Sequence, residues 1–151
     1  MSGEIIQEYK NVIFPPQIVQ MFADIVKQDS VMFSVFEYII KRYKQDGEKN
    51  FNGVSVNDIA NNVKIERPVK IVRGKQIHFE SQVAYIHRQT AGKVIDKLLS
   101  MSLLSYKPLT PYKYFYVTKR GLQVMSEILN RIPDDNSDKE INKEQGDELN
   151  G

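Results

Sequence analysis

The stretch IHRQTAGKVIDKLLSMSLL, residues 86–104, decides the fold of this chain. Its apolar residues recur at the spacing of one helix face, and they are Ala91, Val94, Ile95, Leu98 and Leu99. The other side of the helix start is polar and basic. A helix of this kind can pack by its apolar face while its polar N-terminal face enters the major groove of DNA. Gly92 costs about 1 kcal/mol relative to alanine inside a helix, and it permits a close approach of another backbone.

Three helices are expected ahead of this stretch. Two prolines suit the first turn of a helix that starts at Pro15. Asp29 or Ser30 can cap a second helix, which ends at residues 46–47. Ser55 and the aspartate three residues later form a capping box for a short third helix.

Two β-hairpins and a closing helix complete the predicted order. The first hairpin pairs residues 69–72 with residues 76–79 inside a basic segment, residues 64–81. The second pairs residues 104–107 with residues 112–118 across a proline-containing turn. An amphipathic helix then begins at about Lys119.

This order is that of a winged helix-turn-helix, a mainly α fold with a small β-wing (α+β). Residues 86–104 resemble the recognition helix of MarR-type and PadR-type regulators, in which R-x-T-x-x-x-x-I/V-D-x-L leads into a strand. Residues 116–121, YVTKRG, resemble the end of the wing in the same families. The resemblance covers about residues 30–130. The chain departs from these families by the basic hairpin inserted before the recognition helix, which either adds DNA contacts or packs over the core.

The resemblance implies which residues contact DNA. In the recognition helix, Arg88, Gln89, Thr90 and Lys93 approach base edges and phosphates, and Lys107 and Lys113 flank the wing. Ser55 and Asn57 contact phosphate at the start of the preceding helix. The remaining candidates are His87, at the helix entry, and four basic residues of the insert: Arg67, Lys70, Arg73 and Lys75. The alternative for the helix charges is an ordinary solvated surface, and the wing tyrosines are expected to pack within the strands.

Charge is distributed unevenly along the 151 residues. Residues 31–131 hold 17 lysines and arginines against 8 acidic residues, a net charge of +9, whereas residues 132–151 carry −5. A basic middle between acidic ends suits a polyanionic partner. We expect an N-terminal arm at 1–14, a winged helix-turn-helix domain at 15–132 and an acidic disordered tail at 133–151.

An enzyme is the weakest of the function classes considered. The chain has no cysteine, its two histidines do not form a zinc site, and its glycines do not form a phosphate loop. We therefore expect no metal and no cofactor. No apolar run approaches the roughly 20 residues of a membrane span, so no membrane partner is expected.

The leading hypothesis is a cytoplasmic, sequence-specific protein that binds double-stranded DNA as a homodimer and regulates transcription. Its first and last helices are the expected dimer surfaces, because both are amphipathic and lie outside the motif. One alternative is a plasmid or viral partition or replication protein that coats repeated sites and recruits a second protein through the N-terminal segment or the acidic tail. The other alternative is a winged helix that binds protein only.

Overall fold

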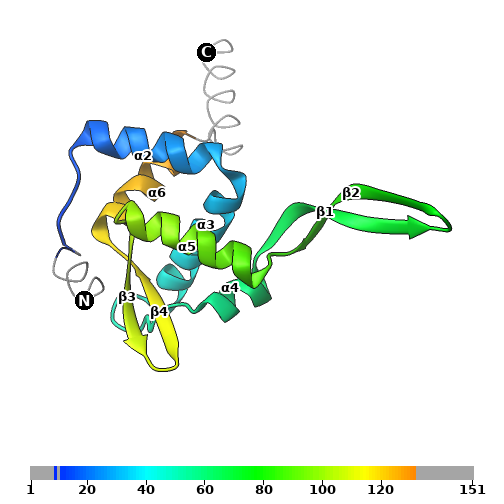
Figure 1. The fold of residues 1–151 in the computed structure, drawn as a ribbon. Coiled ribbons are helices and arrows are strands. Elements are labelled where there is room, and N and C mark those ends of the chain that lie inside the picture. The colour runs from blue at the N-terminus through cyan, green and yellow to red at the C-terminus, as the bar shows by residue number, and fades with distance from the viewer. Residues whose placement is uncertain (1–8, 10, 132–151) are drawn as a thin grey trace, which may run out of the picture.

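The computed structural model describes residue 9 and residues 11–131. Over this range the elements are α2 (Pro16–Gln28), α3 (Ser30–Asp46), α4 (Val56–Asn62), β1 (Lys64–Arg73), β2 (Gln76–Tyr85), α5 (Arg88–Ser100), β3 (Leu104–Leu109), β4 (Tyr112–Val117) and α6 (Lys119–Arg131). The fold is α+β: the helices form one body, and two antiparallel hairpins leave it in different directions (Figure 1). The predicted tail, residues 133–151, lies outside the described residues.

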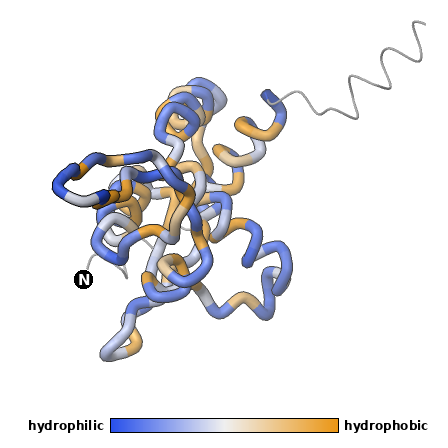
Figure 2. Tube along the Cα trace, turned by 90° about the vertical axis from the view of Figure 1, so that its right-hand side faces the viewer, coloured by the Kyte–Doolittle hydropathy of each residue, from blue (hydrophilic) through white to orange (hydrophobic). Residues whose placement is uncertain are grey.

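The core lies where α3, α5 and α6 face one another. Each of these helices buries one face, and hydrophobic and hydrophilic residues interchange along the whole trace (Figure 2). The largest side chains there are fully buried, among them Phe36, Ile39, Ile95, Leu98 and Ile128. Burying each of them contributes about 1.5–3 kcal/mol relative to leaving it exposed. The predicted apolar stripe of α5 is therefore its core face.

Both predicted helix caps are present. Asp29 caps α3, because its carboxylate accepts a hydrogen bond from the backbone N–H of Met32 at 3.0 Å. At α4 the capping box is complete: Ser55 Oγ accepts from the N–H of Asp58 at 3.1 Å, and Asp58 accepts from the N–H of Ser55 at 3.0 Å. An aspartate thus fills the place usually taken by glutamate. These bonds fix where α4 begins.

The start of α6 is held against the turn that follows α5. Thr118 donates from Oγ1 to the carbonyl of Ser102 at 2.9 Å, and the same oxygen accepts from the N–H of Gly121 at 3.1 Å. A Cβ on Gly121 would lie 2.4 Å from the carbonyl oxygen of Leu103. A side chain has no room there, so the threonine and the glycine of the YVTKRG segment are both structural requirements.

The first hairpin is longer than the sequence predicts. Its strands are ten residues each, 64–73 and 76–85, whereas the apolar alternation predicted only four residues on each side of the turn. Pro68 lies inside β1, where proline is tolerated because this two-stranded sheet leaves both outer edges unpaired. We call residues 64–85 the β-arm. It extends away from the helical body (Figure 1), and its base packs against the core through Ile65. The rest of the insert does not pack over the core, contrary to what one of the two alternatives expected.

The second hairpin is attached to the body through the loop before α4. Val54 pairs with Phe115 of β4, with N–H···O distances of 3.0 and 2.8 Å. The phenol of Tyr116 donates to the carbonyl of Asn52 at 2.9 Å, and its ring contacts the ring of Phe51 edge-on. Tyr116 therefore packs within the fold, as predicted for the tyrosines of this hairpin. β3 also continues through Pro108 and Leu109, two residues expected in the turn.

The segment before α2 is docked on α6. Gln123 exchanges two hydrogen bonds with the backbone of Phe14, at 2.8 and 3.1 Å. The buried guanidinium of Arg120 donates to the carbonyls of Tyr9 and Val12 on one side and to Ser102 on the other. Burial lowers the pKa of Arg120 below its ordinary value, and the surrounding oxygens accept from the N–H groups of its charged guanidinium.

Candidate nucleic-acid interface

A shallow concavity of about 260 Å³ lies where α4, α5 and the second hairpin meet. It brings together four of the predicted site residues: Ser55, Asn57, Arg88 and Lys113. Its described lining holds two cations and no carboxylate. The concavity is thus a small electropositive surface built from three separate parts of the chain.

The start of α4 supplies the two uncharged groups of this surface. Ser55 Oγ already accepts a hydrogen bond within the capping box, so its O–H is the group left to donate to a ligand. Asn57 lies one residue inside the helix and is half-buried. The carboxylate of Asp58 already accepts from the N–H of Ser55 in this first turn, so the groups left for a ligand are the Ser55 hydroxyl and the Asn57 amide.

The start of α5 supplies the longest polar side chains. Arg88, Gln89 and Lys93 are exposed, and Thr90 is half-buried. Over the described residues no side chain caps α5, in contrast to α3 and α4, so its first backbone N–H groups are not taken up by a cap. A Cβ at Gly92 would meet no described atom within 4 Å. The expected close approach at Gly92 is therefore not made by any part of the chain that the structure describes, and this side of α5 is open.

The two lysines of the second hairpin lie on opposite faces. The register places Lys113 on the face of Phe115, toward α4 and α5, and Lys107 on the face of Tyr116. Each ammonium lies over an aromatic ring: Lys113 is 5.1 Å from the centroid of Tyr106, and Lys107 is 5.1 Å from that of Tyr116. Of the two, Lys113 alone lines the concavity.

The four basic residues of the β-arm do not form one patch. Arg67 and Arg73 share one face, Lys70 lies on the other, and Lys75 is in the turn at the far end. Arg67 is taken up within the fold, because its Nη1 donates to Nε2 of His87 at 2.6 Å and its Nε is buried without an acceptor among the described residues. The sequence-based prediction treated these residues as one basic group, but successive residues of a strand point to opposite faces, so they lie on different sides of the arm.

Tyr112 was missed by the sequence-based prediction. It lines the concavity beside Lys113, and 53% of its surface is exposed, because it directly follows the turn at Pro111. The sequence offered one signal, the position of this tyrosine next to a turn proline. Tyr116 differs, since burial raises the pKa of its phenol above the ordinary value of 10.0.

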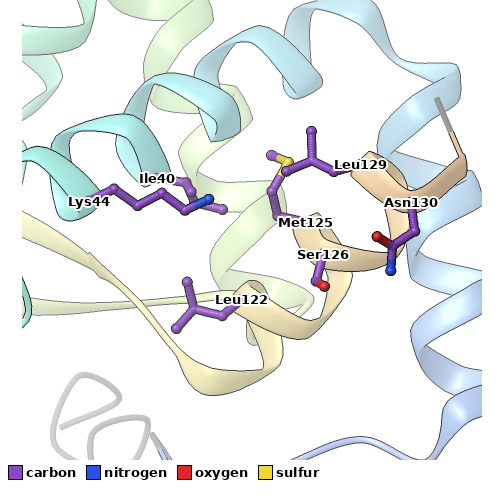
Figure 3. A pocket seen from close by; sticks show the side chains of 7 residues that line it. All are labelled: Ile40, Lys44, Leu122, Met125, Ser126, Leu129 and Asn130. Atoms are coloured by element: carbon purple, nitrogen blue, oxygen red, sulfur yellow. The ribbon is translucent and has the colours of Figure 1, made fainter. Parts of the chain in front are cut away.

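A second cleft, of about 290 Å³, lies between α3 and α6 (Figure 3). Ile40, Leu122, Met125 and Leu129 line it, with Lys44 as its one ionisable group among the described residues. Within the described part of the chain no cluster of three or more metal-ligating side chains is present. None of the described helices is long and apolar enough to cross a bilayer.

Comparison with protein-family models, with curated proteins and with solved structures finds no match to this chain. The assignment of function therefore rests on the site itself.

Proposed function

We propose that the protein is a non-enzymatic, sequence-specific DNA-binding protein with a winged helix-turn-helix fold. In this proposal α5 is the recognition helix, α4 is the helix before it and the β3–β4 hairpin is the wing. The single observation that carries the proposal is the concavity that gathers Ser55, Asn57, Arg88 and Lys113 from these three elements. Residues from three converging elements can contact the phosphate backbone of a duplex that lies across all three.

The chemistry of the exposed side chains supports the same role. Arginine can donate two hydrogen bonds to guanine, and glutamine can make two with adenine, so Arg88 and Gln89 are suited to base edges in the major groove. Lys113, together with the Ser55 hydroxyl and the Asn57 amide, is suited to phosphate. The net charge of +9 over residues 31–131 adds a field that attracts the duplex.

A homodimeric transcription regulator is the form of this function that we favour. One recognition helix contacts too few base pairs for useful selectivity, and two copies related by a two-fold axis double the site. A palindromic binding site follows from that symmetry. Tandem repeats of one half-site would instead favour the partition or replication role.

The test is the affinity of purified protein, measured by anisotropy, for two fluorescent duplexes of about 30 base pairs. One is enriched from a random pool by binding to the protein, and the other has random sequence and gives the non-specific affinity. We expect the Arg88→Ala and Lys113→Ala variants each to weaken binding about 3- to 10-fold. Lys41→Ala is the matched control, because this exposed lysine on α3 pairs only with Glu37 among the described residues. Equal losses of affinity in all three variants would contradict the assigned site, because binding would then depend on overall charge alone. No binding by the wild-type protein would favour a winged helix that binds protein.

A further inference from the structure

One face of the β-arm carries an exposed row of apolar side chains along β2, beside three charged residues of β1: Lys64, Glu66 and Lys70. The register places five exposed hydrophobic side chains on this single face of the two-stranded ribbon: Val72, Ile77, Phe79, Val83 and Tyr85. Their exposed fractions run from 51% for Tyr85 to 67% for Phe79. Large apolar side chains seldom collect on one exposed face of an element without a partner.

The size of this face approaches that of a protein interface. The five side chains expose roughly 500 Å² together, near the upper end of the patches that monomers present. Two such faces packed against each other would bury about 1,000 Å², the lower bound for a specific interface. A two-stranded hairpin without a third strand or a covering helix is also only marginally stable in water. A second layer packed on this face would therefore stabilise the β-arm.

The face is complementary to itself. Pro68 and Ser81 pair at its centre, with Glu66 and Lys70 two residues to either side along β1. A two-fold axis can lie between two such faces, perpendicular to the strands and level with the Pro68–Ser81 pair. It places β1 over β1 of a second copy, with the two strands antiparallel. Glu66 then lies opposite the second copy's Lys70, and this contact is made twice.

The same axis matches the apolar residues of β2. Val83 and Phe79 lie two residues to either side of Ser81, and Tyr85 and Ile77 lie four residues to either side. Val83 thus faces the second copy's Phe79, and Tyr85 faces its Ile77. An axis along the strands would instead place both helical bodies at the same end. It would put all three charged residues of the face over apolar residues, whereas the cross-strand axis does so for Lys64 alone, opposite Val72.

We propose that this face of the β-arm, centred on Pro68 and Ser81, binds the same face of a second copy of the chain. The arms lie antiparallel, each with its tip toward the other helical body. Neither Glu66 nor Lys70 has an ion-pair partner among the described residues, so both charges remain available. The inference does not depend on DNA binding.

This contact replaces the α2 and α6 surfaces expected from the sequence. The amphipathic faces of those helices are accounted for within one chain, because α2 packs on α6 and buries Val19, Ala23 and Val26. What remains exposed there is a smaller apolar surface: Met21 and Ile25, four residues apart on α2, and Leu129 at the cleft between α3 and α6.

The first experiment is sedimentation equilibrium of the full chain without DNA, over about 1 to 100 µM protein. We expect a dimer whose Kd rises at least about tenfold in Phe79→Ser, which removes the most exposed side chain of the face. Leu129→Ser is the matched control and leaves the Kd unchanged. A wild-type protein that is monomeric throughout this range would overturn the proposal, as would loss of the dimer in Leu129→Ser but not in Phe79→Ser.

The second experiment tests the two-fold register by exchanging charges. Glu66→Lys and Lys70→Glu each place like charges opposite each other twice, so each variant alone should dimerise about tenfold more weakly. An equimolar mixture of the two pairs every cation with an anion, and the heterodimer should form within about threefold of the wild-type Kd. A mixture no better than its components would overturn the register.

The outcomes separate this inference from the proposed function. A monomer that binds DNA would sustain the function and overturn the arm contact. If Phe79→Ser weakened DNA binding of such a monomer, the apolar face would contact the duplex instead of a second copy.

Discussion

Arg67 of the β-arm donates a hydrogen bond of 2.6 Å to Nε2 of His87, the residue that precedes α5. A guanidinium has donors only, so Nε2 of the imidazole is the acceptor of this bond. Backbone pairing supports the same junction, because the N–H of Ile86 donates to the carbonyl of Val63 at 2.9 Å. The direction of the β-arm is thereby tied to the start of the proposed recognition helix.

The first prediction concerns this junction. Arg67→Met keeps most of the side-chain stem but removes the donor, so we expect the free energy of unfolding to fall by about 1 kcal/mol. Backbone amides of residues 86–90 should exchange faster by mass spectrometry, because the arm no longer steadies them. Arg73→Met, on the same face but near the tip of the arm, is the control. Equal effects of the two substitutions would show that the junction is not special.

A pair of helical glycines gives the second prediction. In Gly121→Ala the new Cβ meets the carbonyl oxygen of Leu103 at 2.4 Å and Val117 Cγ2 at 2.8 Å. Backbone oxygen cannot move aside cheaply, so urea unfolding should show a loss of about 3 kcal/mol. An unchanged midpoint in urea would mean that α6 shifts to accommodate the methyl group.

Gly92→Ala is the matched opposite case. The position is open and helical, so alanine should raise the free energy of unfolding by about 0.5–1 kcal/mol. If DNA approaches this side of α5, the added methyl group should nevertheless weaken DNA binding. A variant that is more stable and binds DNA as tightly as the wild-type protein would place the duplex elsewhere.

Stability should also fall at alkaline pH. Burial raises the pKa of Tyr43 and of Tyr116 above the ordinary value of 10.0, so the folded chain keeps two phenolic protons that the unfolded chain loses. This contribution is complete below pH 10 and is lost as the pH rises through the folded-state values. Tyr116→Phe should flatten the decline seen in urea unfolding above about pH 10, and an unchanged decline would contradict this assignment.

Much of the fold could be predicted from sequence because its signals are local. The caps at Asp29 and Ser55 depend on residues three positions apart, and the stripe of α5 depends on its own periodicity. The extent of the β-arm could not be predicted, because Pro68 and the charges around it hide the strand pattern. A strand can contain Pro68 and these charges here because β1 pairs with β2 alone among the described strands. That pairing is a property of the tertiary structure, and the local sequence does not give it.

The candidate site was predicted in part for a similar reason. Residue type and position along α4 and α5 identified Ser55, Asn57 and Arg88, which the fold does bring together with Lys113. The faces of Lys107 and Lys70 depend on strand register, which charge alone does not give. The contact of Arg67 with His87 joins residues 20 positions apart, and no sequence motif predicts it.

The most direct test of DNA binding is its salt dependence, measured by anisotropy with a labelled random duplex. For a protein that neutralises several phosphates, the logarithm of the binding constant falls linearly with the logarithm of salt concentration, with a slope of about −0.9 per phosphate. We predict a slope of about −3 or steeper for the wild-type protein, reduced in magnitude by about 1 in Lys113→Ala. Absence of binding at about 50 mM salt, or a slope near zero, would contradict the proposal that this protein binds DNA.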